Sequence, residues 1–222
     1  MNNLPTLQDL RDNVQIAYKN DALNSILNVD TPSNWLKNHP FATKTVEGKK
    51  VPILYLPIDK VEYLMTKIFQ VWNVEVISTT QLFNSVSCHV RVHFKDPISD
   101  TMRFHDGVGA VGIQTDKGAT AADMSAIKQD AVMKALPAAK SYAIKDACEH
   151  IGKIFGRDLN RPDSIAFQMS VKNPDEEIEQ LTELFNLKRE SLSADDVTNI
   201  ERIISEKDVK SYKKAISKLQ SV

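Results

Sequence analysis

The segment from Ser141 to Asn160, SYAIKDACEHIGKIFGRDLN, constrains the fold most strongly because it joins a helical pattern to a clear stop. Its apolar side chains recur at helical spacing and would form one buried stripe, made of Ala143, Ala147, Ile151 and Ile154. Phe155 and Gly156 then end the pattern, since glycine readily takes the left-handed conformation found just past a helix C-terminus. We therefore expect a helix over Ser141 to Phe155 that buries this stripe and exposes its charged face. Pro137 would lie in the turn that begins the helix, where proline is tolerated.

The region between residues 74 and 106 has the period-two alternation of β-strands. Residues 74–80, 85–95 and 101–106 follow one another with short connections, which favours an antiparallel meander. In the longest strand the expected core face carries Cys88, Val90, Val92 and Phe94, and the opposite face carries His89, Arg91 and His93. The opposite face would meet solvent, a groove or another subunit.

Helical patterns flank this meander on both sides. Residues 6–28 and 59–71 show apolar side chains at helical spacing, and residues from Asn173 onward read as two or three helices with acidic starts and basic ends. We therefore predict an α+β fold, with the meander packed on a long helix and helical additions at both ends. The predicted domains are residues 1–172 and a helical appendage at 173–222.

Composition places the chain among ordinary globular proteins. It has 222 residues, 42% hydrophobic and 26% charged, enough for one core with an appendage or for two small domains. Cys88 and Cys148 match no metal or redox spacing and read as buried, reduced thiols. No apolar run of about 18 residues occurs, and the first residues lack a signal-peptide profile. We expect a soluble cytoplasmic protein.

The net charge of −1 argues mildly against a nucleic-acid binder, but the charge is unevenly spread. Residues 174–222 hold 11 acidic and 8 basic side chains, so residues 1–173 hold 18 acidic and 20 basic ones out of the totals of 29 and 28. A local basic groove can exist within such an average, and the groove decides whether phosphates bind.

The segment Gly107–Gly112 satisfies the pattern G-x-G-x-x-G. In a dinucleotide site these glycines form a turn that enters a helix inside a parallel βαβ unit. Here the following residues, IQTDKGAT, are turn-like, and the preceding strands suggest an antiparallel sheet. We interpret the glycines as a turn and a close approach of the backbone, and expect no cofactor. An enzyme that binds a nucleotide cofactor with this loop stays open as an alternative.

Other catalytic signatures are weak. There is no Walker A motif and no nucleophile elbow. His89, His93 and His105 could meet across paired strands, but no further ligand has metal-site spacing, so we expect no metal. Nothing in the sequence requires catalysis, and we predict a protein that is not an enzyme.

Five segments in a fixed order carry a family resemblance. They are Tyr55-Leu56-Pro57, IFQVWNVEV (68–76), VRVHFKD (90–96), DGVG (106–109) and the helix that closes on Phe155-Gly156. Together they resemble the Rad-fifty-two superfamily of single-strand DNA annealing proteins, especially its Sak-type members from phages and prophages. The resemblance covers about the first 165 residues and does not extend to the C-terminal segment.

This resemblance implies a function. The family binds single-stranded DNA without ATP, anneals complementary strands in recombination and repair, and assembles into rings, so we expect a homo-oligomer. A phage-encoded member would work in the cytoplasm of the bacterial host, with a single-strand binding protein or an exonuclease as a candidate partner. A DNA-binding accessory or end-protection module that shares the fold but does not anneal remains the leading alternative.

Annealing requires cations for the phosphates and aromatic rings for the bases, with base-pairing edges left accessible. By resemblance, Tyr55 takes the place of a groove aromatic, Lys44 lies near a basic position, and Lys153 matches a basic residue three before the final glycine. Glu149 and His150 stand where the family is often basic, so Lys145 or Arg157 would compensate.

A second, outer DNA contact is implied for three further cations. Lys95, at the end of VRVHFK, matches a position of that outer contact, and we assign Lys117 and Arg161 to the same surface.

Overall fold

The computed structural model describes residues 13–46, 48–120, 123–161 and 166–221. These residues form six α-helices and two antiparallel sheets, so the predicted α+β class is confirmed. They divide into two compact units. The sheet unit is Ile26–Phe167, and the helical unit combines the residues up to Ser25 with those from Gln168 onward.

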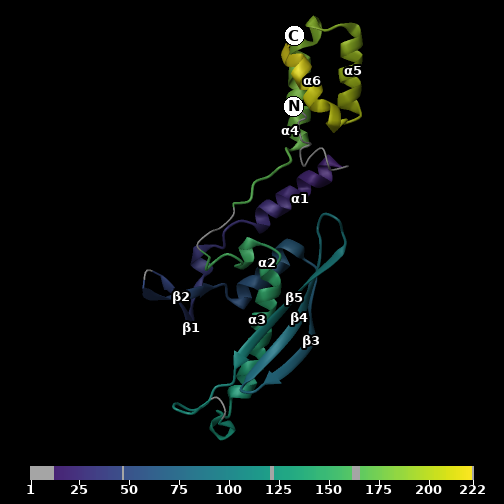
Figure 1. Ribbon diagram of the computed structural model, residues 1–222. Helices are drawn as coiled ribbons and strands as arrows, with labels where there is room; N and C mark the ends of the chain where they lie inside the picture. The colour runs from purple at the N-terminus through teal and green to yellow at the C-terminus, as the bar shows by residue number, and fades with distance from the viewer. Residues whose placement is uncertain (1–12, 47, 121–122, 162–165, 222) are drawn as a thin grey trace, which may run out of the picture. The chain divides into compact units, whose positions relative to one another are not determined.

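The main sheet of the sheet unit is the predicted meander (Figure 1). Strands β3 (Trp72–Leu82), β4 (Ser85–Lys95) and β5 (Met102–Gly112) pair antiparallel in this order. The register opposes Val90 to Gly107 and Lys95 to Met102. β5 is longer than the expected 101–106 segment because it continues through the glycines.

Helix α3 (Ala131–Glu149) lies along one face of this sheet (Figure 1). The predicted core face of β4 is confirmed, since its side chains are almost completely buried: Cys88, Val90, Val92 and Phe94. The helix presents a stripe of small residues to the sheet, Ala139, Ala143 and Ala147, each with no exposed surface. Alanine lets the helix axis approach the strands closely.

The glycines of β5 explain this close approach and correct the sequence interpretation. A Cβ atom added to Gly107 would lie 2.2 Å from the Ala143 carbonyl oxygen, and one added to Gly109 would lie 2.3 Å from the Ala139 carbonyl oxygen. The expected close backbone approach is therefore correct, with α3 as the neighbour. The expected turn is wrong, because Gly107–Gly112 belongs to a strand. These glycines therefore do not form the turn into a helix that a dinucleotide fingerprint requires.

Helix α3 differs from the expected Ser141–Phe155 helix at both ends. It begins before Pro137, which lies inside the helix and not in its first turn. It ends at Glu149 because Gly152, shortly after it, takes an extended conformation. Gly152 packs closely on Leu27: a Cβ added to Gly152 would lie 2.4 Å from the Leu27 carbonyl oxygen. A 3-10 turn over Lys153–Phe155 follows, and Gly156 then has the predicted left-handed conformation, with φ of 102°.

The remaining elements of the sheet unit support its core. β1 (Lys37–Val46) and β2 (Lys49–Tyr55) form an antiparallel hairpin, and α2 (Ile58–Phe69) follows it. The helical spacing predicted for residues 59–71 is confirmed, because α2 buries one face through four residues: Val61, Leu64, Met65 and Phe69. The Phe69 ring packs 4.5 Å from that of Phe94 on β4.

The helical unit contains most of α1 (Val14–Leu27) and the three C-terminal helices. These are α4 (Pro174–Lys188), α5 (Ala194–Ser205) and α6 (Val209–Ser221), as the sequence predicts. Their shared core includes Leu181, Phe185, Ile200, Ile203, Tyr212 and Leu219. Asn173 and Ser193 cap α4 and α5 through their side-chain oxygens.

Asp21 joins α1 to the segment before α4. Its buried carboxylate accepts hydrogen bonds from the Ser170 backbone N–H and hydroxyl and from the Val171 N–H, at 2.8–3.0 Å. This packing groups α1 with the C-terminal helices, whereas the predicted domains place residues 1–172 together. The functional division into an annealing domain at 1–172 and an appendage at 173–222 stays a prediction. The first residues of the predicted 6–28 helix lie outside the described residues.

Both cysteines are buried and unpaired, as predicted. Burial raises the pKa of Cys148 to about 12, so this thiol stays protonated. Within the described residues, no helix combines the length and the apolar character needed to cross a bilayer.

Candidate functional site

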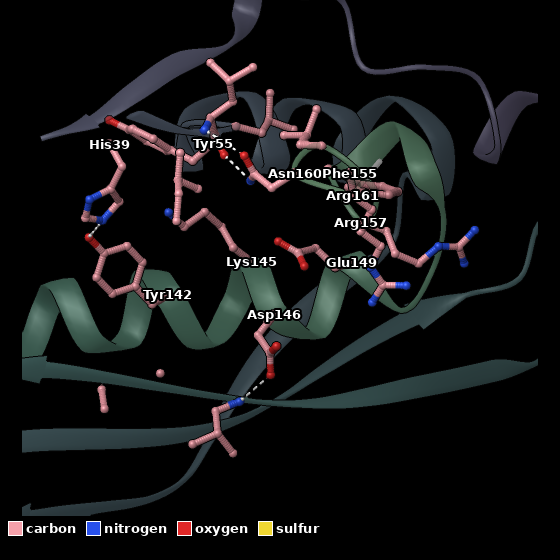
Figure 2. A pocket seen from close by; sticks show the side chains of 18 residues that line it. His39, Tyr55, Tyr142, Lys145, Asp146, Glu149, Phe155, Arg157, Asn160 and Arg161 are labelled. Atoms are coloured by element: carbon pink, nitrogen blue, oxygen red, sulfur yellow. Dashed lines mark hydrogen bonds between the residues drawn. The ribbon is translucent and has the colours of Figure 1, made fainter. Parts of the chain in front are cut away.

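A cleft of about 450 Å³ opens in the sheet unit between α3 and the β1–β2 hairpin (Figure 2). α3 contributes Tyr142, Lys145, Asp146 and Glu149 to its wall, and the hairpin contributes His39 and the residues around Tyr55. The segment 155–161, which follows the helix, closes the remaining side. Polar and charged side chains from three separate parts of the chain thus meet in one hollow.

Lys145 occupies the centre of this cleft. Its ammonium nitrogen lies 4.3 Å from the centroid of the Tyr142 ring and 4.8 Å from that of Tyr55. Tyr142 and Lys145 are three residues apart on α3 and therefore share a face of the helix. Tyr55 comes from the end of β2. Each contact is a cation–π interaction, which holds the ammonium group beside the two rings.

His39 fixes the second aromatic ring. Its Nε2 atom lies 3.2 Å from the Tyr142 hydroxyl, within hydrogen-bond distance, and the two rings are stacked with centroids 6.2 Å apart. The His39 ring also meets that of Tyr55 edge-on at 5.9 Å. The three rings therefore form a connected aromatic wall around Lys145.

Asn160 attaches the 155–161 segment to the hairpin. Its side-chain amide donates to the Leu54 carbonyl at 2.8 Å and accepts from the Leu54 N–H at 3.0 Å, so it pairs with β2 as another strand would (Figure 2). Lys44 on β1 donates to the Asn160 carbonyl at 3.3 Å. These bonds hold the two sides of the cleft at a fixed spacing.

Arg157 and Arg161 bring further positive charge to the cleft. Arg157 donates to the Asn28 side chain at 2.8 Å, and both arginines lie 3.9 Å from the same carboxylate, that of Asp158. The Arg161 side chain is mostly exposed. One carboxylate shared at such distances leaves guanidinium N–H groups available to an anion.

Two carboxylates also line the cleft. Asp146 points toward β5 and accepts a hydrogen bond from the Val108 N–H at 2.9 Å (Figure 2). Burial and the negative charge of Asp146 raise the pKa of Glu149 to about 7, although Lys145 and Arg161 oppose this shift. Burial also lowers the pKa of Lys145, and Glu149 opposes that shift.

A second hollow of about 570 Å³ adjoins the first one along α3. It shares His39, Ala110 and Tyr142 with the cleft and continues over the small residues Ala131, Ala135 and Ala138 toward Lys134. The two hollows form one path along the helix, with the His39–Tyr142 pair at their junction.

The structure brings together only part of the predicted DNA-binding set. Tyr55, Lys145, Arg157 and Arg161 line the cleft, and Lys44 contacts its wall through Asn160. Lys145 and Arg157, the two residues expected to compensate for Glu149 and His150, thus both line the cleft. Whether any of them binds DNA stays a prediction.

Lys153 is not among the residues that line the cleft. Its ammonium group lies 2.6 Å from the Asp30 carboxylate, and only 12% of its side chain is exposed. The Thr31 hydroxyl donates to the carbonyls of Lys153 and Ile154. Lys153 therefore joins the 3-10 turn to the segment after α1, because α3 ends earlier than the sequence pattern suggests.

Lys95 and Lys117 do not form one surface with Arg161. Lys95 pairs with Asp100 at 2.6 Å beside Met102, where β5 begins, whereas Lys117 follows Gly112, where β5 ends. The length of such a strand is roughly 30 Å, which separates the two lysines. Arg161 belongs to the cleft.

Sequence reasoning missed several polar residues of the site, among them His39, Tyr142, Asp146 and Asn160. Tyr142 could have been predicted from the sequence, because it precedes Lys145 by three positions and residues at this spacing share one face of a helix. His39 and Asn160 reach the cleft only through the hairpin and the turn after α3, and no local pattern indicates that placement.

The sheet surface opposite α3 forms what we call the open face, made of Glu75, His89, Arg91, His93, Phe104 and Asp106. Arg91 donates two hydrogen bonds to Asp106, at 2.7 and 2.9 Å, and its guanidinium lies 4.2 Å from the Phe104 ring centroid. His93 pairs with Glu75 at 3.0 Å. Each charged group on this face is matched by a neighbour of opposite charge or by a histidine.

The three histidines considered as metal ligands do not meet. His89 and His93 lie on the open face, whereas His105 stacks on Phe94 and His150 on the side covered by α3. Among the described residues, no three His, Cys, Asp or Glu side chains converge as a metal site requires.

Comparison with known proteins gives no assignment: no family model and no curated protein sequence matches this chain. What indicates a function is therefore the geometry of the cleft together with the resemblance in the sequence motifs.

Proposed function

We propose that this protein binds single-stranded DNA in the cleft and promotes the annealing of complementary strands without ATP. The observation that carries the proposal is the position of Lys145, 4.3 and 4.8 Å from two tyrosine rings in an open cleft. Arg157 and Arg161 line the same cleft. Cations combined with accessible aromatic rings are the pairing that single-strand binding uses.

The chemistry of the cleft suits a strand that must still pair with its complement. Lys and Arg neutralise phosphates whatever the base sequence, and aromatic rings stack on any base. Arg157 and Arg161 would contact the backbone, and Tyr55 offers a ring surface beside Lys145. None of these contacts needs the base-pairing edges, so a second strand can approach them.

The size of the cleft favours a short stretch of strand. Its volume of about 450 Å³ lies within the range of sites that hold one small molecule, roughly 300–1,000 Å³. The adjoining hollow extends the path along α3. Contact with a longer strand would need several copies of the cleft, side by side.

We therefore also propose a homo-oligomer, in the form of the ring that the sequence resemblance implies. In the described part of the chain, β3 and β5 each pair with β4 alone, so no further strand borders either edge of the sheet, although Asp146 accepts the Val108 N–H on the β5 edge. Unpaired edges are available for contacts between subunits, and head-to-tail contacts close into rings. Light scattering of the purified full chain would give the subunit number; a monomer at all concentrations would contradict this part of the proposal.

The functional test is the annealing of two complementary labelled oligonucleotides without ATP, with and without the protein. We expect faster annealing with the protein and a loss of most of the acceleration in Lys145→Ala. Binding of single strands without acceleration would instead support the accessory-module alternative. No binding at all would contradict the proposal.

Salt provides an independent check on the binding mode. Phosphate neutralisation releases counterions, so the binding constant should fall steeply as salt is added. The loss of one phosphate contact lowers the slope of log K against log salt by about 0.7 for a single strand, which is the change expected for Arg161→Gln.

A further inference from the structure

The carboxylate of Glu149 is unusual for a cleft that is proposed to bind phosphates. It belongs to α3, four residues after Lys145, and both side chains point into the cleft (Figure 2). A Lys and a Glu at this spacing often form an ion pair. Here Lys145 instead lies beside the rings of Tyr55 and Tyr142. Within the described residues, no hydrogen bond or ion pair holds the Glu149 carboxylate, unlike that of Asp146.

The surroundings of Glu149 oppose its negative charge. The charged and titratable groups around it come from every wall of the cleft: Lys145 and Asp146 on α3, Arg157 and Arg161 after it, and His39, Tyr55 and Tyr142 in the aromatic wall. Burial and Asp146 favour the neutral acid, and Lys145 and Arg161 favour the carboxylate. The balance leaves the pKa of Glu149 at about 7, so both forms are present near neutral pH.

A bound phosphate would change this balance in one direction. Its negative charge would repel the Glu149 carboxylate and would compete with it for Lys145 and Arg161, the two cations that stabilise the charged form. A strand that fills the cleft would also displace water, which adds to the desolvation. All three effects favour the protonated, neutral side chain.

We propose that the cleft takes up a proton together with the DNA strand, with Glu149 as the group that is protonated. This inference depends on the proposed function and adds a regulation to the same site. A neutral Glu149 removes the repulsion and can donate its O–H to a phosphate oxygen. The strand therefore binds more tightly as the pH falls through neutrality and is released more easily as it rises.

The size of the effect follows from linkage. If the strand binds only the neutral form, the binding constant is proportional to the fraction of Glu149 that is protonated in the unbound protein. With the pKa at about 7, this fraction falls about tenfold between pH 6 and pH 8. The wild type should lose about tenfold more affinity over this range than Glu149→Gln, which keeps a neutral side chain of the same shape at every pH. All groups other than residue 149 are the same in the two proteins, so their contributions cancel in the comparison.

The experiment is a fluorescence-anisotropy titration of a labelled oligonucleotide at pH 6, 7 and 8, at constant ionic strength, with the wild type and Glu149→Gln. Glu179→Gln is the matched control, because it removes the same charge from an exposed position on α4 in the helical unit. We expect the control to show the same change in affinity between pH 6 and pH 8 as the wild type. In Glu149→Gln this change should be about tenfold smaller.

Equal pH dependence in the wild type and Glu149→Gln, with strand binding intact, would overturn this inference and leave the proposed function standing. No strand binding at any pH would overturn both. Calorimetry of the wild type in buffers of different ionisation enthalpy gives a second measure that needs no variant. At pH 7 it should show uptake of about half a proton per cleft, and zero uptake would contradict the inference.

Discussion

The cleft and the open face of the sheet each place a cation on an aromatic ring, but they leave that cation in different states. On the open face, Arg91 lies 4.2 Å from the Phe104 ring centroid and donates two hydrogen bonds to Asp106. In the cleft, Lys145 lies between two rings, and its neighbour Glu149 is held near half-protonation at neutral pH. A count of basic residues does not distinguish these two situations.

The comparison shows that the partner of a cation decides whether it can bind a phosphate. The Asp106 carboxylate satisfies Arg91 with two parallel bonds, and the Arg91 guanidinium holds the pKa of Asp106 below its usual range. The cleft offers Lys145 ring faces and a carboxylate that readily becomes neutral. An incoming phosphate would have to displace the Arg91–Asp106 ion pair on the open face, whereas in the cleft it would meet an ammonium group held beside two rings.

The largest expected effect concerns the side of the sheet that α3 covers. Gly109→Ala would place a Cβ 2.3 Å from the Ala139 carbonyl oxygen and 2.5 Å from the Ala143 nitrogen, both backbone atoms that cannot move independently. We expect a loss of about 3 kcal/mol or more in the free energy of unfolding, measured by urea denaturation.

Gly112→Ala, at the uncovered end of the same strand, is the matched control. Apart from the residue itself and its two chain neighbours, no described atom lies within 4 Å of the methyl group that alanine would add there. Alanine in a strand also loses less chain entropy than glycine on folding. We expect it to stabilise the protein by about 0.5 kcal/mol. Equal losses in the two variants would mean that the contact between α3 and β5 is wrong.

The next effect compares the two cations directly in DNA binding. Lys145→Ala should weaken single-strand binding about tenfold or more, because a hydrogen bond to a charged group contributes roughly 1.5–3 kcal/mol. Arg91→Ala should change it by less than about twofold, since Asp106 already occupies that guanidinium. Anisotropy titrations of both variants would measure this, and a larger loss in Arg91→Ala would move the binding site to the open face.

The two carboxylates should respond to pH with opposite signs. The pKa of Asp106 is lowered in the folded protein, so its contribution to stability is fully present at pH values above the usual pKa of an aspartate. This contribution is lost as the pH falls through the folded-state pKa. Glu149 has a raised pKa of about 7, so the folded protein binds more protons than the unfolded chain between the usual glutamate pKa and pH 7. Stability therefore falls as the pH rises through that window.

Thermal unfolding at pH 5 and pH 8 measures this difference. Glu149→Gln should raise Tm relative to the wild type at pH 8 and much less at pH 5. Asp106→Asn should lower Tm at both pH values, because Asp106 is ionised at both. If the difference in Tm between Glu149→Gln and the wild type were the same at pH 5 and pH 8, the pKa of Glu149 would not be raised and the account would be wrong.

The smallest expected effect belongs to Lys153. Its ammonium group pairs with Asp30 and it does not line the cleft, so Lys153→Ala should change strand binding by less than about twofold. The same anisotropy titration that measures Lys145→Ala provides the value. A tenfold loss in Lys153→Ala with an unchanged fold would restore the role that the motif resemblance gave it.

Sequence periodicity predicted most of the sheet unit because each element buries one regular face. The alternation of β4 and the helical spacing of Val61, Leu64 and Met65 translate directly into buried side chains. The end of α3 could not be predicted in this way, since it depends on the contact between Gly152 and Leu27, residues far apart in the sequence. The sequence around Gly107 and Gly109 predicts a turn because nothing near them shows that a side chain there would clash with α3, a helix that follows much later in the chain.

The candidate site was predictable only where its residues share one element. Lys145 and Tyr142 lie on one helix, and Tyr55 belongs to one of the segments that carry the family resemblance. His39 and Asn160, in contrast, reach the cleft only through the hairpin and the turn after α3. Lys153 shows the converse case: its position in the motif pointed to the groove, and the early end of α3 directed it to Asp30.

The most direct test of the central claim is a photocrosslink between the protein and a single strand that carries 5-iodouracil, with the attached peptides mapped by mass spectrometry. If the strand lies in the cleft, the crosslinks will fall on Tyr55 and Tyr142, the two rings beside Lys145. Crosslinks on Phe104 of the open face, with none in the cleft, would contradict the claim.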